Sequence, residues 1–248
     1  MTIESLWIGA PAPRALVFLH EGLGSVAQWR DTPAAISRAT GLPAFVYSRA
    51  GYGRSSPVAV PRPLRYMHDE AAALPAILRD AGITEPVLIG HSDGASIAII
   101  AAGSGVVQPR ALVLIAPHVF VEDISVQSIA AARDAYEHGD LRARLAKYHA
   151  DVDGAFWGWN RAWLDPGFRS WNLEQYLPQI TAPVLIVQGT ADQYGTLAQV
   201  DAIERQVGTS SGKRVVEKLL VEGAGHAPFR DAPAEVAARI ARFIELST

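Results

Sequence analysis

The sequence contains no cysteine among its 248 residues. This absence excludes disulfide bonds, thiolate metal ligands and a cysteine nucleophile. A zinc-protease motif is also incomplete, because His20-Glu21 begins the pattern H-E-x-x-H but Gly24 stands where its second histidine would be. No other cluster of ligands is visible, so the sequence predicts no metal site.

Long apolar stretches and a strong charge of either sign are missing as well. No run approaches the roughly 18 apolar residues of a membrane span, and the N-terminus lacks the basic segment and apolar core of a secretory signal. The formal net charge of −3 offers no basic surface for nucleic acid. We therefore expect a cytoplasmic monomer or homodimer that acts on a small molecule, without nucleic-acid or membrane partners.

What the chain does contain is a regular alternation of short apolar runs with helical patterns. Tyr66–Ala81 is one such helical pattern, and another near the end has Pro233 in its first turn. Six runs have the length and the bounding turn residues of buried strands: Ala15–Leu19, Pro43–Tyr47, Pro86–Ile89, Ala111–Ile115, Pro183–Val187 and Val215–Val221. This alternation predicts an α/β fold with a mostly parallel central sheet flanked by helices.

The segment 118–179 breaks the alternation. It shows no convincing strand, and it carries four of the six tryptophans: Trp157, Trp159, Trp163 and Trp171. Pro183 then restarts the strand pattern. We interpret 118–179 as a helical lid inserted over the sheet, and 1–117 with 180–248 as a single core domain.

The pentapeptide Gly90-His91-Ser92-Asp93-Gly94 matches the pattern G-x-S-x-G between a strand and a helix pattern. A serine at such a sharp turn has glycine on both sides because side chains there would collide. The turn exposes the hydroxyl and directs the helix N-terminus toward developing negative charge. Since the pentapeptide alone is a weak signal, the case for Ser92 as a nucleophile depends on its partners.

A serine hydroxyl becomes nucleophilic when a histidine takes its proton and a carboxylate orients that histidine. Asp192 comes directly after the strand pattern that ends at Val187, and His226 comes directly after the last strand pattern. Alone, either residue would be equally compatible with an ordinary loop. Together with Ser92, in this order, they predict a catalytic triad. Asp201 is a weaker alternative acid because it falls inside a helix pattern.

The loop His20–Ser25 follows the first strand pattern and is rich in glycine. Its backbone N–H groups, with that of Asp93, would bind the oxyanion of a tetrahedral intermediate. We predict Leu23 as the donor from this loop, with Gly22 as the alternative. The loop also fits the dinucleotide pattern G-x-G-x-x-G/A, but Ser48-Arg49 occupies the place of the acidic residue that would hold a ribose. A dehydrogenase is therefore the weaker interpretation.

The other histidines differ in their surroundings. His91 lies on the strand side of the turn and is expected to form pocket wall rather than act as the base. His118 follows the strand Ala111–Ile115 and is a candidate for the pocket lining. The remaining three lie in helical, charge-bearing segments and are expected to be solvated: His68, His138 and His149.

These motifs resemble those of the α/β-hydrolase superfamily over essentially the whole chain. The run Tyr47–Ser55 is similar to the turn D-x-R-G-x-G-x-S of that superfamily, with Ser48 in place of the aspartate. The nearest resemblance is to valacyclovirase-like and carboxylesterase-like members, the former through Ser92-Asp93-Gly94. The resemblance implies that Asp93 contributes to recognising a substrate amino group. The alternative is that Asp93 only stabilises the start of the helix.

The combined prediction is a serine hydrolase that cleaves an ester or related acyl bond of a small, partly apolar substrate through an acyl-enzyme, without a cofactor. The expected substrate contacts are Asp93, His118, Trp157, Trp159 and Trp163, although the tryptophans could equally pack the lid on the sheet. A C–C bond hydrolase, an enol-lactonase and a thioesterase are alternatives, because triad chemistry is common to all. A receptor that keeps this fold without catalysis is a remote alternative.

Overall fold

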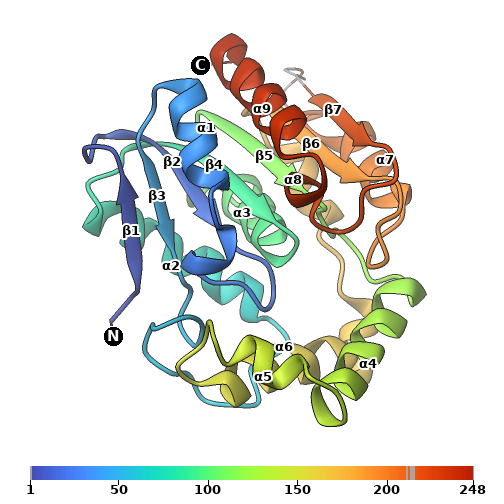
Figure 1. The fold of residues 1–248 in the computed structure, drawn as a ribbon. Coiled ribbons are helices and arrows are strands. Elements are labelled where there is room, and N and C mark those ends of the chain that lie inside the picture. Colours follow the sequence, from blue (N-terminus) through green and yellow to red (C-terminus); the bar gives the residue numbers. More distant parts are fainter. Residues whose placement is uncertain (1, 211, 213–215, 248) are drawn as a thin grey trace.

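A seven-stranded sheet runs through the computed structural model, which describes residues 2–210, 212 and 216–247 (Figure 1). The strands lie in the order β1-β3-β2-β4-β5-β6-β7; β1 is antiparallel to β3, and all other neighbours are parallel. Their bounds are Ser5–Ile8 (β1), Arg14–Leu19 (β2), Ala44–Tyr47 (β3), Glu85–His91 (β4), Ala111–Ile115 (β5), Val184–Gly189 (β6) and Val216–Val221 (β7). The mostly parallel sheet predicted from the apolar runs is confirmed.

Two details of the strands differ from the expectation. β1 was not predicted, because it is a half-exposed edge strand without a continuous apolar run. Val215, the expected start of the last strand, lies outside the described residues.

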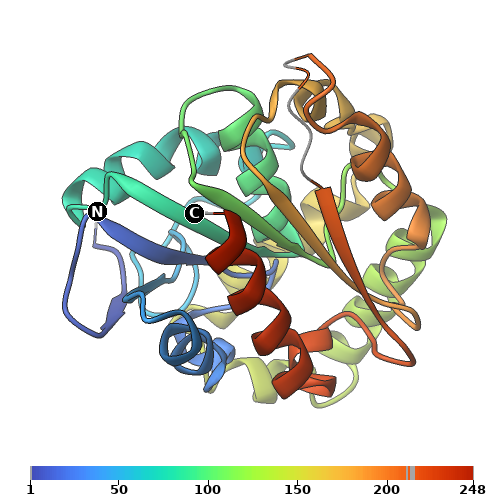
Figure 2. The same cartoon turned by 90° about the horizontal axis from the view of Figure 1, so that it is seen from above.

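Helices cover both faces of the sheet (Figure 2). The first face carries α1 (Thr32–Thr40) and α9 (Pro233–Ser247), which pack on each other, and the second carries α2 (Tyr66–Asp80) and α3 (Asp93–Gly103). The remaining helices described outside residues 118–179 are η1 (Val26–Trp29), α7 (Leu197–Gln206) and α8 (Pro228–Asp231). None of the helices described is both long and apolar enough to cross a membrane.

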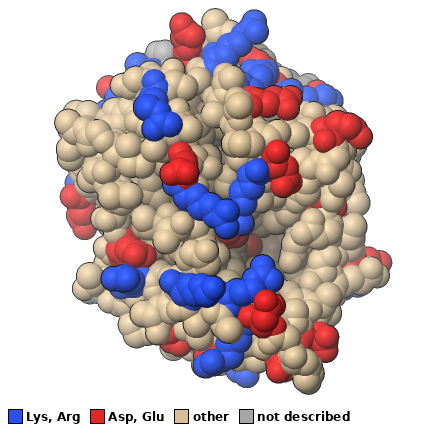
Figure 3. Space-filling view, in the orientation of Figure 1, with Lys and Arg blue, Asp and Glu red and all other residues tan. Residues whose placement is uncertain are grey.

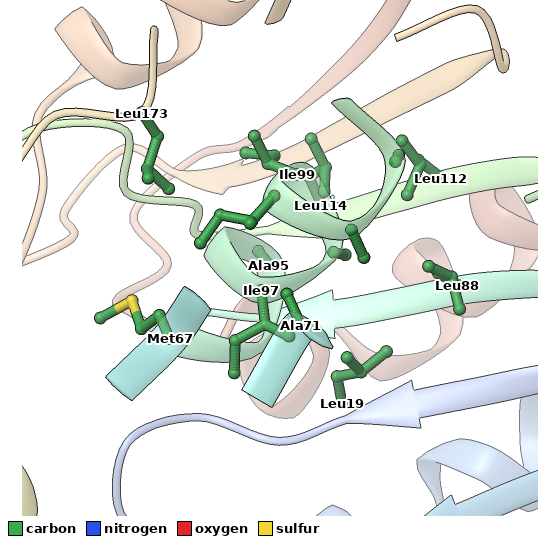
Figure 4. Close-up of a cluster of buried hydrophobic side chains, with 14 of the residues drawn as sticks. Leu19, Met67, Ala71, Leu88, Ala95, Ile97, Ile99, Leu112, Leu114 and Leu173 are labelled. Carbon is green, nitrogen blue, oxygen red and sulfur yellow. The ribbon is translucent and has the colours of Figure 1, made fainter. Parts of the chain in front are cut away.

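The core is divided by the sheet, as the side-chain alternation of a strand requires. Along β2, Leu16 and Phe18 join the buried cluster beneath α1 and α9, whereas Val17 and Leu19 join the cluster beneath α2 and α3. Figure 4 shows part of the second cluster, where side chains of α3 lie between those of the strands and of α2. Because β2 is buried on both faces from Ala15 to Leu19, its sequence there is a continuous run of apolar residues.

The segment 118–179, between β5 and β6, adds no strand to the sheet and contains one isolated bridge, between Phe120 and Asn172. Its helices are α4 (Asp123–Glu137), α5 (Leu141–Leu145), α6 (Val152–Leu164) and the 3-10 turns η2 (Pro166–Ser170) and η3 (Glu174–Gln179). α4, α5 and α6 contact one another and lie together beyond one end of the sheet (Figure 1), η2 contacts α6, and η3 packs on α3 and α7. We call this segment the helical segment.

Candidate active site

Ser92 occupies the turn between β4 and α3 in a strained backbone conformation, with φ 53° and ψ −119°. The glycines on either side allow the turn to pack closely. A Cβ atom on Gly94 would lie 2.0 Å from the carbonyl oxygen of Leu19, and one on Gly90 would lie 2.4 Å from the carbonyl oxygen of Gly94. Neither backbone neighbour can move away cheaply, so this turn requires glycine at both places.

A continuous chain of hydrogen bonds joins Ser92 to the two residues predicted as its partners. Nε2 of His226 lies 2.9 Å from Oγ of Ser92. Nδ1 of His226 lies 2.9 Å from Oδ1 and 2.8 Å from Oδ2 of Asp192. Since a carboxylate only accepts, Nδ1 carries the proton and Nε2 is free to accept the proton of the serine hydroxyl.

The loops after β6 and β7 bring the acid and the histidine together. Gly189, at the end of β6, lies against the second loop so closely that a Cβ atom would be 2.3 Å from the carbonyl oxygens of Ala224 and Gly225. The backbone N–H of Ala191 donates to the carbonyl of Ala224 at 2.9 Å. Because β6 and β7 are adjacent parallel strands, both loops leave the same edge of the sheet.

Asp192 is held as a carboxylate. Burial acts to raise its pKa, but the hydrogen bond and charge of His226, the backbone N–H of Tyr194 and the amide of Gln188 together hold the pKa below its ordinary value. Tyr194 donates to Oδ1 at 2.7 Å and Gln188 donates to Oδ2 at 2.8 Å. Each carboxylate oxygen therefore has a fixed partner besides the histidine.

His91 positions the backbone of His226. Its Nε2 donates to the carbonyl of His226 at 2.7 Å, and its Nδ1 lies 3.4 Å from Oε2 of Glu21. Burial acts to raise the pKa of Glu21, but His91 and Arg230 outweigh it, so the pKa lies well below its usual range. Glu21 is therefore ionised, and it lies beside His91.

Ser92 and His226 line a pocket of about 550 Å³. Four of the five predicted substrate contacts line it: Asp93, His118, Trp159 and Trp163. Trp157 does not line it, which corrects the prediction. Its ring packs edge-on against Tyr136 and Phe156, with the guanidinium of Arg161 over its face, because the helical twist of α6 turns this position away from the pocket.

The loop after β2 places its backbone at the same pocket, lined by both Gly22 and Leu23. No described residue accepts a hydrogen bond from the backbone N–H of Leu23 or of Gly22. Asp93 is the first residue of α3, where a backbone N–H has no partner within the helix. Gly22 also packs against Trp159, since a Cβ atom there would lie 2.2 Å from the indole nitrogen.

His149 is buried rather than solvated, contrary to the prediction. Its Nδ1 accepts from the backbone N–H of Gly53 at 2.9 Å, and its Nε2 donates to the carbonyl of Leu23 at 2.9 Å. Burial lowers its pKa, in agreement with a neutral ring that accepts at one nitrogen and donates at the other. His149 thus ties the helical segment to the loop that carries Leu23.

Asp93 is 1% exposed and lies at the base of the pocket. Its Oδ2 accepts from the hydroxyl of Tyr66 at 2.5 Å, and its Oδ1 accepts from the indole N–H of Trp163 at 3.2 Å. Burial raises the pKa of Asp93, although Arg49, Tyr66 and Trp163 act in the opposite direction. The carboxylate therefore connects α2 and α6 to the turn that carries Ser92.

Comparison with known proteins identifies the family to which the fold belongs. A profile of the alpha/beta hydrolase family matches residues 16–239. The chain belongs to the alpha/beta hydrolase family. A search of proteins with curated functions finds no match to the sequence.

Three solved structures illustrate the shared fold of this alpha/beta hydrolase. A carboxylesterase structure from Nitrososphaera gargenis has a TM-score of 0.79 at 15% identity, with 99% of this chain and 94% of that chain covered. The enol-lactonase of Burkholderia xenovorans LB400 has a TM-score of 0.75 at 15% identity, covering 98% and 96%. A monoacylglycerol lipase of Paleococcus ferrophilus has a TM-score of 0.70 at 16% identity, covering 100% of both chains.

Several residues at the site of this alpha/beta hydrolase had no signal in the sequence. Tyr194 lies with its ring 4.7 Å from that of His226, and Tyr66 holds Asp93. Arg144 and Arg230 line the pocket mouth. No short motif marks any of them: Tyr66 and Arg144 come to the site from distant parts of the chain, and Tyr194 and Arg230 lie near Asp192 and His226 in sequence but belong to no recognised pattern. Within the described ranges, no group of three or more potential ligand side chains is arranged to hold a metal ion.

Proposed function

We propose that this alpha/beta hydrolase cleaves ester or related acyl bonds of small, partly apolar substrates through an acyl-enzyme on Ser92. One observation carries the proposal: the unbroken chain from Oγ of Ser92 through His226 to Asp192, which opens into the pocket. A base within hydrogen-bond reach of the nucleophile, itself oriented by a carboxylate, is the arrangement that acyl transfer requires.

In the first half-reaction, His226 takes the hydroxyl proton while Ser92 attacks the acyl carbon. The N–H groups of Leu23 and Asp93 stabilise the resulting oxyanion, and Gly22 is the alternative donor in the loop. Collapse of the intermediate breaks the bond to the leaving group, which receives the proton from His226. Water, deprotonated by the same histidine, then attacks the acyl-enzyme and releases the acid and the free serine.

The helical segment acts as a lid in this proposal. Ile129 of α4 and Trp159 and Trp163 of α6 supply apolar pocket lining. Such a lining favours an apolar or aromatic acyl group and keeps bulk water away from the acyl-enzyme. His118 adds a buried ring whose Nδ1 has no hydrogen-bond partner among the described residues, and it could contact a polar substrate atom.

The similar structures include those of carboxylesterases, a monoacylglycerol lipase and an enol-lactonase, and this likeness supports a carboxylic ester substrate. The test is a panel of 4-nitrophenyl esters, thioesters, enol-lactones and C–C ring-cleavage products, together with labelling by a fluorophosphonate. We expect turnover of short esters and a mass increase on the peptide that contains Ser92. If the protein turned over only thioesters, only lactones or only C–C substrates, that substrate class would be assigned in place of the ester. Labelling at another residue, or none, would contradict the acyl-enzyme.

The role of Asp93 can be tested by Asp93→Asn. Because both carboxylate oxygens already accept from Tyr66 and Trp163, we propose that Asp93 acts by positioning Trp163 rather than by binding a substrate amino group. The variant should then lower kcat/KM for amino-acid esters and for neutral esters by a similar factor, about three- to tenfold. Tyr66→Phe removes the hydrogen bond to Oδ2 of Asp93 and also the contact between the Tyr66 hydroxyl and Nε1 of Trp163 at 3.0 Å, so it should cause a loss of the same kind on both sets of esters. A loss restricted to amino-acid esters would instead assign amino-group recognition to Asp93.

A further inference from the structure

A second hollow of about 240 Å³ adjoins the active-site pocket, between α5 of the helical segment and the sheet domain. Arg144 and Arg230 line both hollows, so the two meet at these side chains. We call the second hollow the basic groove. Its lining residues are Gln28, Arg30, Leu141, Arg144, Leu145, Lys147, Tyr148 and Arg230.

The basic groove concentrates positive charge on a protein whose net charge is −3. Its lining contains four cationic side chains and no carboxylate. Figure 3 shows positive side chains on both sides of the hollow near the middle of this face. Such an arrangement attracts anions, and the low-dielectric walls of a groove strengthen the attraction.

Two of these four cations form only long ion pairs with a carboxylate, and the other two form no ion pair among the described residues. A guanidinium nitrogen of Arg144 lies 3.5 Å from Oδ1 of Asp140, and one of Arg230 lies 3.6 Å from Oε1 of Glu21. Arg30 and Lys147 are exposed, and no carboxylate among the described residues pairs with either. The groove therefore keeps an excess of positive charge that a ligand can use.

The position of the groove relative to His226 tells which part of a substrate would enter it. In the proposed reaction His226 gives its proton to the leaving group, so that group must lie beside Nε2. α8 begins at Pro228, two residues after this histidine, and carries Arg230. Because His226 and Arg230 both line the active-site pocket and Arg230 also lines the groove, we assign the groove to the leaving alcohol or thiol.

We propose that the basic groove, through Arg30, Arg144, Lys147 and Arg230, binds an anionic group, carboxylate or phosphate, on the leaving alcohol or thiol of the substrate. This inference rests on the proposed acyl-enzyme function. Each exposed charge contact is weak by itself, so the selectivity comes from several cations together and falls as salt is raised. The physiological substrate is then an ester or thioester with an apolar acyl group and an anionic leaving group.

The kinetic test uses butyrate esters that share one acyl group. The leaving groups are methyl 4-hydroxybenzoate (neutral), 4-hydroxybenzoate (carboxylate) and 4-hydroxyphenyl phosphate (phosphate). The measured quantity is the ratio of kcat/KM for each anionic ester to that for the neutral ester. We expect this ratio to exceed one at low salt and to fall about tenfold in Arg144→Gln/Lys147→Gln. The larger of the two ratios identifies the anion that the groove prefers.

The matched control is Arg38→Gln/Arg133→Gln, which removes the same charge from two exposed arginines that line neither hollow. This variant should keep the ratio of the unmodified protein, because it changes only the net charge. If the ratio of kcat/KM fell equally in both double variants, the effect would come from the net charge of the protein, and the groove would not be a binding site for the anion. A further ester, mono-4-nitrophenyl succinate, carries its carboxylate on the acyl group. Its kcat/KM relative to that of 4-nitrophenyl butyrate should not fall tenfold in Arg144→Gln/Lys147→Gln. A tenfold fall would show that the groove does not select for an anion on the leaving group.

A binding measurement separates failure of this inference from failure of the proposed reaction. Calorimetric titration of 4-hydroxybenzoate and of 4-hydroxyphenyl phosphate into Ser92→Ala requires no turnover. Binding that is lost when Arg144→Gln/Lys147→Gln is added supports the groove even if no ester is cleaved. Binding that survives those changes, or no binding at low salt, overturns the inference while leaving the ester panel and the labelling of Ser92 to decide the reaction.

Discussion

Replacing Ser92 by alanine lowers kcat for a short-chain ester by about three to six orders of magnitude and leaves the fold intact. The hydroxyl is the atom that the acyl group joins, and no other described hydroxyl lies within hydrogen-bond distance of Nε2 of His226. Removing one oxygen from a side chain that is 7% exposed costs little packing. The measurement is single-substrate kinetics, with circular dichroism and thermal unfolding to establish that the variant is folded.

The control for this prediction is Ser104→Ala, which also removes a hydroxyl. Ser104 follows α3 at the end remote from Ser92, and its Oγ donates to the carbonyl of Ile100 at 2.6 Å. This change should leave kcat within about twofold, since surface caps away from a site affect stability by small amounts. Wild-type activity in folded Ser92→Ala would refute the proposed mechanism.

Replacing Asp192 by asparagine lowers kcat by about three to four orders of magnitude. The backbone N–H of Tyr194 donates to the Oδ1 position and cannot turn, so the asparagine keeps its oxygen there and places its NH₂ group at the Oδ2 position, 2.8 Å from Nδ1 of His226. The amide of Gln188, which donates to Oδ2 of Asp192, then turns so that its own oxygen accepts from this NH₂ group. Nδ1 then accepts, and the ring proton moves to Nε2. In that tautomer the histidine donates toward Ser92 and cannot take its proton. Steady-state kinetics with a 4-nitrophenyl ester measures the loss.

Asp201→Asn provides the matched control, because Asp201 is the alternative acid that the sequence offered after β6. It is exposed on α7, and His226 makes its hydrogen bonds to Asp192 instead. The variant should retain full kcat. If Asp201→Asn lost as much activity as Asp192→Asn, the assignment of the acid would have to be reversed.

The central strands and the order of the three candidate catalytic residues followed from the sequence, because both depend on local pattern. A strand buried on two faces is apolar along most of its length, as β2, β4, β5 and β6 are, and their few polar residues lie at the strand ends. The turn at Ser92 needs small neighbours wherever it occurs, so its glycines are visible without a structure. Asp192 and His226 could be selected because each follows a strand directly.

The surroundings of the site depend on contacts between distant segments, which no local pattern encodes. Asp93 meets Tyr66 across 27 residues and Trp163 across 70, while His149 reaches the carbonyl of Leu23 across 126. The sequence could place His149 in a helical, charge-bearing segment, but only packing decided that it is buried. The direction of Trp157 on α6 was undecided for the same reason.

The sequence alone was thus enough to predict the parallel strands of the sheet, the sharp turn at Ser92 and the loops that carry Asp192 and His226, since periodicity and turn chemistry act over a few residues. Tertiary structure decided which side chains line the pocket, what holds Asp93, and how Arg30, Arg144, Lys147 and Arg230 come to face one groove. These four cations come from three separate parts of the chain. They meet because the helical segment packs across the end of the sheet, and burial of apolar surface drives that packing.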